Sequence, residues 1–546
     1  MANGVAAEAV EETELLNYFH EKSRYSGIWK YLFSTDHKKV CLLYLTAMIA
    51  FFLCGVGFAM LLRLELMAPG MDFIGASTYN AVYTLHGVFM IFLFVIPGLP
   101  AVFGNFCIPI MIGAEDVSFP KLNLLSWYLF MSGAVLIILS LFIGGGAPDT
   151  GWTFYAPWSI KTSANIPMAV MGVFLVGFSS ILTGLNFVTT IHRLRAPGVT
   201  FGKLPLFVWG IYTTGWLQIL ATPVIGITLL MVFMERMFGF GFFDPANGGD
   251  PVMYQHLFWI YSHPAVYIMI LPAMGAISDI IPTFCRKPIF GYKAMAGALV
   301  SIGLIAYIVW GHHMFTSGMS DTGRIIFSFL TFFVGVPTAI KVFNWVATLH
   351  KGAIIFSTPM WYAMAFIFLF SIGGLSGMIN GVLAVDLHIH DTYFIVAHIH
   401  YVVFGGTGFG FFAAIHYWFP KMFGRMYSEV IAKWALGLFF VGFNVLYFPM
   451  FIYGYMGNPR RYYDYPPRFE FWQFVSTVGS WIMVPGIILM LANLIWGAFK
   501  GKKASANPWG GVTLEWTVPS PPPLLNFDKI PHVTRGPYDY KGEESK

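Results

Sequence analysis

Two histidines, His398 and His400, lie two residues apart near the start of an apolar segment at 394–417. An α-helix turns about 100° per residue, so the two imidazoles point to nearly opposite sides of one helix. That helix can therefore offer one imidazole ligand to each of two groups bound on its opposite sides. The alternative is that both are ordinary hydrogen-bonded polar residues at a helix interface, although ionisable residues within a membrane are rare and usually functional.

Four more histidines, His86, His263, His312 and His313, lie in or at the ends of other apolar segments. At a rise of about 1.5 Å per residue, all six imidazoles are expected within about 10 Å of one plane. Neutral imidazole is a strong ligand for copper and iron. Without metals, several of these polar groups would be unpaired in hydrocarbon, at a cost of roughly a few kcal/mol each. Residue type and shared depth favour redox-metal sites over structural histidines.

The elements that must position these side chains are membrane-spanning helices. Of 546 residues, 57% are hydrophobic and 10% are charged, whereas a soluble protein carries about 25% charged residues. The composition indicates an all-α polytopic membrane protein. Apolar runs predict about 12 spans, at 40–62, 79–112, 122–145, 166–192, 206–234, 256–282, 293–313, 325–348, 358–382, 394–417, 430–455 and 473–498.

Composition also excludes several classes of protein. The four cysteines are scattered with no CxxC pair, which argues against a zinc site, a disulfide framework and covalently attached haem. The net charge of +5 is modest and no nucleic-acid signature accompanies it. Residues 1–35 form a polar N-terminal extension that does not look like a cleaved signal peptide. Residues 36–500 form the membrane domain, and 501–546 a polar tail expected to be an extended surface segment.

The termini are expected in the cytoplasm, because an even number of spans puts both on one side and most loop Lys and Arg residues fall on that side. Lys341 is the only lysine placed within a span, toward the cytoplasm from the histidines, and a buried ammonium tends to give up its proton. Thr338 lies one turn nearer the histidines. Tyr267 is four residues after His263, on the same helical face. These positions predict a proton path through Lys341, Thr338 and Tyr267.

Several motifs carry a resemblance to a known family. They are Leu85-His86-Gly87, Tyr261-Ser262-His263-Pro264-Ala265-Val266-Tyr267, Trp310-Gly311-His312-His313-Met314, Val336-Pro337-Thr338-Ala339-Ile340-Lys341, His390-Asp391-Thr392-Tyr393 and Ala397-His398-Ile399-His400-Tyr401. Together they resemble the heme-copper oxidase family, specifically catalytic subunit I of the cytochrome c oxidase type, over about residues 35–500. The resemblance implies helices bundled around two haems and a copper ion.

The resemblance assigns a role to each histidine. His86 and His400 would be the axial ligands of a low-spin haem, and His398 the single proximal ligand of a high-spin haem. Copper B would be held by His263, His312 and His313. Spacing alone leaves open which of His398 and His400 serves which haem, so that assignment comes from the family. Tyr267 would be bonded covalently to the copper-ligand histidine and supply an electron and a proton for O–O cleavage.

The family's second proton channel matches in part. Asp116, Asn105 and Asn123 correspond to its entrance, and Ser179 and Ser180 could continue it. The chain departs from the commonest pattern at Ala265, where many members carry a glutamate. Tyr261, four residues earlier on the same helix face, and Ser262 could place a hydroxyl near the missing carboxylate. This resembles a subclass with Tyr-Ser in place of the glutamate, and proton pumping is expected to survive and to need Tyr261.

Further matches concern the outer side of the membrane domain. His390 and Asp391 by themselves fit either a hard-metal site of the Mg²⁺ type or a hydrated loop; the resemblance favours the Mg²⁺ or Mn²⁺ site shared with subunit II. The planar guanidinium group of an arginine can donate two parallel hydrogen bonds to one carboxylate. The resemblance implies that Arg460 and Arg461 bind haem propionates and that Trp152 and Tyr155 pack near those propionates. It also implies that Arg63 lies beside a haem formyl group, which hints at haem A, and that Glu65 is a Ca²⁺ or Na⁺ ligand.

The resulting expectation is the catalytic subunit of a proton-pumping terminal oxidase in a bacterial cytoplasmic membrane. It would reduce O₂ to water with electrons from cytochrome c, delivered by a subunit II that carries the primary copper pair, and would also assemble with a subunit III. Quinol oxidation is an alternative, disfavoured by apolar residues in the first two spans. Nitric oxide reduction is less favoured, because Tyr267 and Lys341 are present. A transporter would leave the histidines unexplained.

Overall fold

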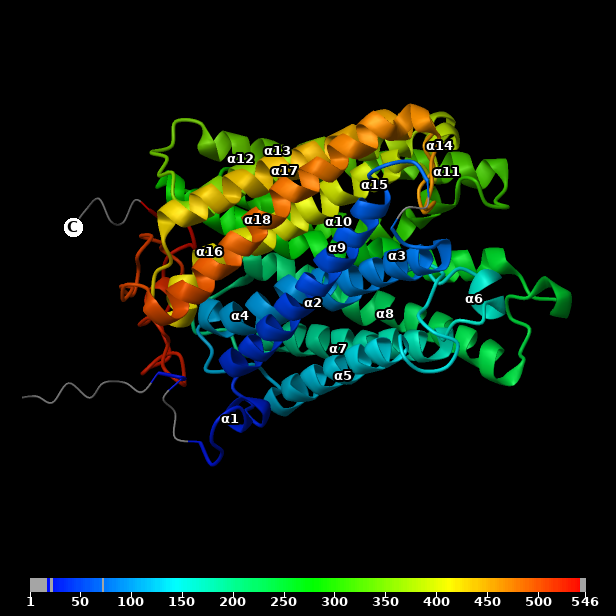
Figure 1. Cartoon of the computed structure of the whole chain (residues 1–546). Coiled ribbons are helices and arrows are strands. Elements are labelled where there is room, and N and C mark those ends of the chain that lie inside the picture. Colours follow the sequence, from blue (N-terminus) through cyan, green and yellow to red (C-terminus); the bar gives the residue numbers. More distant parts are fainter. Residues whose placement is uncertain (1–16, 20–22, 71–72, 541–546) are drawn as a thin grey trace, which may run out of the picture.

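The computed structural model describes residues 17–19, 23–70 and 73–540. Within these ranges the chain forms a bundle of long helices and no strand (Figure 1). The α-helices are α1 (Trp29–Leu32), α2 (His37–Glu65), α3 (Ala76–Met90), α4 (Asn105–Ile112), α5 (Pro120–Leu139), α6 (Trp158–Lys161), α7 (Ile166–Arg193), α8 (Leu206–Phe238), α9 (Pro251–Cys285), α10 (Tyr292–Ile305), α11 (Asp321–Phe333), α12 (Gly335–Leu349), α13 (Thr358–Gly381), α14 (Leu383–Ile389), α15 (Tyr393–Ile399), α16 (Phe409–Phe423), α17 (Glu429–Tyr455) and α18 (Glu470–Lys500).

Eleven helical stretches among the described residues are long and apolar enough to cross a membrane, and a shorter apolar helix covers Tyr292–Ile308. The predicted all-helical membrane fold is therefore confirmed, and each predicted span has a counterpart. The span predicted at 293–313 is shorter than expected. Its α-helix gives way to 3₁₀ turns at Ala306–Ile308 and Trp310–Met314, and the second of these turns carries His312 and His313.

Two spans contain π-helical turns, in which each hydrogen bond skips one more residue than in an α-helix. The second span, Ala76–Ile112, is one continuous 37-residue helix interrupted by π segments at Ile91–Val95 and Gly98–Gly104. The segment between α15 and α16 is π-helical over His400–Gly408. Such turns change which residues face a neighbour and are frequent at functional sites. Here one begins at His400 itself.

The tail after α18 is not the surface segment that the sequence predicted. Residues 501–540 lie across one end of the bundle, beside the described N-terminal residues (Figure 1). Its only helical turn is Leu514–Trp516, but Glu515 and Asn526 are fully buried and Trp516 is nearly so. Lys421 on α16 donates to Ala506 O at 2.7 Å and also to Val518 O. Part of the tail is buried, because it satisfies polar groups at the helix ends, and local sequence does not reveal these contacts.

Candidate metal centres and proton paths

Three predicted ligands, His263, His312 and His313, converge at one point between α9 and the 3₁₀ turn Trp310–Met314. His263 Nδ1 lies 3.0 Å from His313 Nε2, and His312 Nε2 lies 3.2 Å from the same atom. Together they form the one group of metal-type ligands found among the described residues. Three imidazole nitrogens about 2 Å from one metal ion would lie about 3 Å apart. Geometry and donor type therefore fit a three-histidine copper site.

Neighbouring groups fix the orientation of these rings. Thr331 on α11 has its Oγ1 2.9 Å from His312 Nδ1, so this bond engages the nitrogen that faces away from the centre. Trp259 stacks on His313 with ring centroids 3.7 Å apart and planes 9° apart. A hydrogen bond to the ring nitrogen that does not bind the metal, or a ring stacked on the imidazole, usually fixes the tautomer or orientation of the ligand and strengthens metal binding.

His86 and His400 face each other across the space between α3 and the π segment that follows α15. Their ring centroids are 6.3 Å apart and their planes differ by 15°. His86 Nδ1 lies 2.9 Å from Gly55 O, and His400 Nδ1 lies 2.8 Å from Val396 O. A carbonyl only accepts, so both Nδ1 atoms carry hydrogen and each Nε2 has a free lone pair. Metal–nitrogen bonds of about 2 Å on both sides would give about this ring separation.

His398 is held separately from that pair, by α13. Its Nδ1 lies 3.0 Å from Gly373 O and 3.1 Å from Ser376 Oγ, which again leaves Nε2 as the metal-binding atom. Gly377 passes so close that a Cβ there would lie 2.9 Å from His398 Cε1. The single helix Tyr393–Phe423 thus presents His398 to α13 and His400 to His86, as the two-residue spacing predicted.

Tyr267 lies beside the three-histidine cluster, with its ring centroid 4.9 Å from that of His263. Lys341 on α12 is fully buried, and its Nζ has no hydrogen-bond partner within the described part of the chain. Its ammonium lies 5.3 Å from the centroid of the Trp345 ring. The Thr338 hydroxyl donates to Val334 O. No direct contact joins these three predicted proton carriers among the described residues, so transfer between them requires water.

Three residues of the second predicted path, Asn105, Asn123 and Ser179, lie in one run of hydrogen bonds that also includes Ser126 and Tyr44. Asn123 donates to Asn105 Oδ1 at 2.7 Å, and Ser126 donates to Asn123 O at 2.7 Å. Tyr44 Oη then lies 3.0 Å from Ser126 Oγ and 3.1 Å from Ser179 Oγ. The structure thus brings together residues from α2, α4, α5 and α7 that the sequence separates widely.

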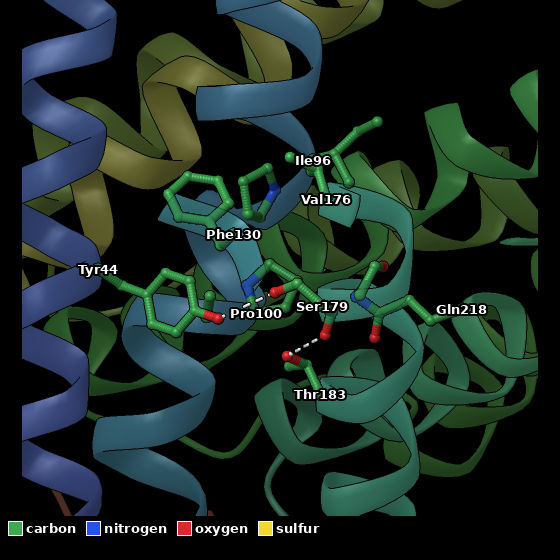
Figure 2. Close-up of a pocket in the computed structure, with 11 residues that line it drawn as sticks. Tyr44, Ile96, Pro100, Phe130, Val176, Ser179, Thr183 and Gln218 are labelled. Carbon is green, nitrogen blue, oxygen red and sulfur yellow. Dashed lines mark hydrogen bonds between the residues drawn. The ribbon is translucent and has the colours of Figure 1, made fainter. Parts of the chain in front are cut away.

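The run ends at a small cavity. Its volume is about 20 Å³, enough for about one water molecule. Figure 2 shows Tyr44 and Ser179 joined by a hydrogen bond at its wall, with Thr183 and Gln218 beside them. Ser180 also lines it, and its hydroxyl is buried without a partner in the described structure. Unpaired polar atoms around a water-sized space favour a bound water.

The predicted substitute for the glutamate does not reach this cavity. Tyr261 and Ser262 on α9 are buried, but neither lines the cavity. The Ser262 hydroxyl is buried and has no hydrogen-bond partner within the described residues. A proton leaving Ser179 therefore needs further water to reach Tyr261.

Asp116, at the start of this path, lies in the loop after α4 and is only half-buried. Desolvation, followed by the negative charge of Asp36, raises the pKa of Asp116 to about 7. Asp36 is paired with Lys38 at 3.0 Å. Burial opposes ionisation of Asp36, but the charges of Lys38 and His37 and the hydrogen bonds from Lys38 and Lys39 together outweigh it, so the pKa of Asp36 is lowered. A carboxyl that titrates near neutrality suits repeated proton uptake.

The outer loop brings His390, Asp391 and Arg460 together. His390 Nε2 lies 3.8 Å from Asp391 Oδ2, and Arg460 Nε lies 3.7 Å from Asp391 Oδ1. His390 Nδ1 is 3.0 Å from Asp386 Oδ2. Burial lowers the pKa of His390, but the hydrogen bond and charge of Asp386 outweigh it and raise this pKa overall. Asp386 is thus a further carboxylate of the cluster.

The remaining predicted residues occupy two places. The guanidinium of Arg461 lies against Gly151, beside Trp152, and Trp259 donates to the Tyr155 hydroxyl. Arg63 lies apart, donating to Gln473 Oε1 at 2.9 Å and Thr477 Oγ1 at 2.9 Å. Glu65 is buried; its Oε2 accepts from Phe73 N and Ile74 N at 3.0 and 2.7 Å, and its Oε1 has no partner in the described structure.

Sequence reasoning missed several residues that touch these sites. Trp259 was detectable, because it lies one helical turn before His263 on the same face. Tyr447, stacked on His400 with ring centroids 4.2 Å apart, comes from α17, and no sequence pattern connects the two. The same is true of Thr331, Ser376 and Tyr44.

Comparison with known proteins agrees with the geometry. Residues 39–482 match the family model "Cytochrome C and Quinol oxidase polypeptide I". Cytochrome c oxidase subunit 1 of Bacillus subtilis is 45% identical over 524 residues, covering 95% of this chain and 84% of the relative. The protein of the same name from Cereibacter sphaeroides is 41% identical, covering 94% of this chain and 97% of its own.

A solved structure has the same fold. A heme-copper terminal oxidase dimer determined by cryo-EM superimposes with a TM-score of 0.75 at 21% identity, covering 86% of this chain and 85% of that one. The likeness extends across most of the helix bundle.

Proposed function

The chain belongs to the cytochrome c and quinol oxidase polypeptide I family, as the catalytic subunit of a heme-copper terminal oxidase, and on that premise we propose which residues do the work. His86 and His400 ligate the low-spin haem and His398 the high-spin haem. Copper B is held by His263, His312 and His313. The observation that carries this assignment is the convergence of three imidazole nitrogens within 4.8 Å of one another.

Haem and copper B are the cofactors of the family. When bound, the high-spin haem and copper B supply the electrons and the open coordination site at which O₂ is reduced. Facing these groups, Tyr267 presents a phenol 4.9 Å from the His263 ring, measured between ring centroids. From this position its hydroxyl gives a proton, and its ring an electron, to the reacting oxygen. Thr331 and Trp259 keep the copper-binding imidazoles in one orientation.

Protons for the chemistry come from the cytoplasm along two paths. Lys341 carries a proton past Thr338 to Tyr267, and the complete burial of its amino group without a hydrogen-bond partner among the described residues favours release. Asp116 feeds the run Asn105, Asn123, Ser126, Tyr44 and Ser179. From the cavity beyond, Tyr261 and Ser262 take over the part that a glutamate plays in many members, because Ala265 has no ionisable group.

The protein is an integral membrane protein that works in a complex with other subunits. We propose that both termini lie in the cytoplasm, that subunit II carries the primary copper pair and receives electrons from cytochrome c, and that a subunit III is present. His390, Asp391 and Asp386 form the Mg²⁺ or Mn²⁺ site, and Arg460 and Arg461 bind haem propionates near Trp152 and Tyr155. Arg63 indicates haem A, and Glu65 ligates Ca²⁺.

One set of measurements tests this assignment. The purified complex should consume O₂ with reduced cytochrome c and show two haems in a reduced-minus-oxidised spectrum, with haem A on extraction. Oxygen uptake with quinol and not with cytochrome c would reject the proposal that cytochrome c is the electron donor. A spectrum that lacked haem bands would reject the whole proposal.

A further inference from the structure

Asn526 belongs to the tail, beyond the last span, yet it is completely buried. Its backbone has φ +66°, in the left-handed region where asparagine is tolerated better than most side-chain-bearing residues. The other tail contacts described above satisfy polar groups at the ends of helices. A buried asparagine in this conformation is costly unless its amide is fully used.

The amide of Asn526 joins two separate elements. Its Nδ2 donates to Ala114 O at 2.9 Å and to Glu115 O at 3.0 Å, the two residues before Asp116. Its Oδ1 accepts from Lys38 Nζ at 3.0 Å. His37 Nε2 lies 3.0 Å from Nδ2 and 3.3 Å from Oδ1. One tail side chain thus ties the loop after α4 to the start of α2.

Two of the partners of Asn526, His37 and Lys38, make further contacts near the second proton path. The opposite ring nitrogen of His37, Nδ1, lies 2.7 Å from Asn105 O, and Asn105 is bonded to Asn123. Lys38 also donates to Leu524 O of the tail at 2.8 Å, and it pairs with Asp36 at 3.0 Å. The charges of Asp36 and Lys38 act on Asp116, and the backbone of His37 forms a hydrogen bond with its carboxyl.

We propose that Asn526 is a positioning residue for proton uptake at Asp116. It holds the backbone at 114–115 against His37 and Lys38, and so fixes the position of Asp116, the next residue along the chain. The inference rests on the proposed role of Asp116. In this chain, the geometry of the proton entrance is set by a residue more than four hundred positions away in sequence.

The test is made on the whole complex in lipid vesicles. Asn526→Gly removes the amide and keeps the left-handed backbone unstrained. Asn526→Asp keeps the size and the acceptor for Lys38 but removes both N–H donors. A matched control is Asn507→Ala, since Asn507 is a tail asparagine whose amide bonds only Gly511, at 2.8 and 2.9 Å. Proton uptake, protons pumped per electron and the haem spectrum are measured for each.

With haem spectra unchanged, Asn526→Gly and Asn526→Asp should slow proton uptake by about tenfold, as expected when a reacting group is misplaced by about 1 Å. They should also lower the number of protons pumped per electron, while Asn507→Ala behaves as wild type. Normal uptake and pumping in both Asn526 variants would overturn the proposal, as would loss of haem in both, which indicates a structural role. An Asp116→Asn variant tests the role of Asp116 separately from the role of Asn526. If Asp116→Asn pumps normally, the proposed role of Asp116 itself is wrong.

Discussion

Trp259 lies face to face on His313, with ring centroids 3.7 Å apart and planes 9° apart. The stacked indole prevents the imidazole from rotating out of the three-histidine cluster, so it should preserve the metal-binding geometry. The Trp259 Nε1–H is anchored in turn by the Tyr155 hydroxyl. A ligand ring clamped this way loses little entropy on binding a metal.

Replacing Trp259 with leucine should therefore weaken copper binding by about tenfold to a hundredfold, the usual effect of losing a supporting contact. The measurement is copper per haem in the purified complex, with oxygen uptake alongside. Trp434→Leu is the control, because Trp434 is 70% exposed on α17. Full copper occupancy in Trp259→Leu would show that the stacking is incidental.

Thr331→Val removes the hydroxyl beside His312 Nδ1 while keeping the shape of the side chain. We expect a loss of copper affinity of about tenfold, because His312 can then adopt the wrong tautomer. Thr189→Val is the control, since Thr189 is bonded only to Leu185 O on the surface of α7. Equal copper retention by the two variants under dialysis against a chelator would contradict this role of Thr331.

Lys341→Met should slow turnover by about a hundredfold or more while leaving both haem spectra intact, because it removes the only ionisable side chain on α12. Stopped-flow reduction of the oxygen site should show the same delay. Turnover within a factor of about two of wild type would mean that protons reach Tyr267 by another path.

Tyr261→Phe deletes a single hydroxyl near Ala265. If Tyr261 replaces the glutamate, the variant should pump fewer protons per electron, and turnover should fall by about tenfold or more. The ratio is measured with a pH indicator outside vesicles after a pulse of reduced cytochrome c. A normal ratio would refute this use of Tyr261, and Ser262→Ala would then be the next variant to examine.

Asp116 gives a pH-dependent prediction with a definite sign. Its pKa is raised from 3.8 to about 7, so the folded protein binds this proton more tightly than the unfolded chain does. The associated stabilisation is complete below pH 3.8 and is lost as the pH rises through about 7. Proton delivery through Asp116 should likewise decline above neutrality. Thermal stability and proton uptake measured from pH 6 to 8 should change less in Asp116→Asn; an unaltered profile would contradict the assignment.

Hydropathy and helical spacing were enough to predict the spans and the shared depth of the six histidines, because both depend on local periodicity, whereas the grouping of the histidines into sites came from the family resemblance. His398 and His400 were placed on opposite sides of one helix by the 100° turn per residue alone, and the contacts of the two rings follow that division. The sequence could not predict that Thr331 or Tyr447 would touch these rings, since each comes from another helix. No local pattern indicates that His37 is buried, because the residue that packs against its ring, Asn526, comes from the distant tail.

The order of the chain adds a consequence of the Asn526 contacts. A ribosome makes Ala114 and Asp116 hundreds of residues before it makes Asn526, and the spans from α5 to α18 are inserted in between. The loop after α4 therefore lacks its hydrogen bonds with Asn526 until translation is nearly complete. A subunit released before that point would lack the hydrogen bonds of Asn526 to residues 114–115, so the proposed role of Asn526 implies that it would take up protons poorly at Asp116.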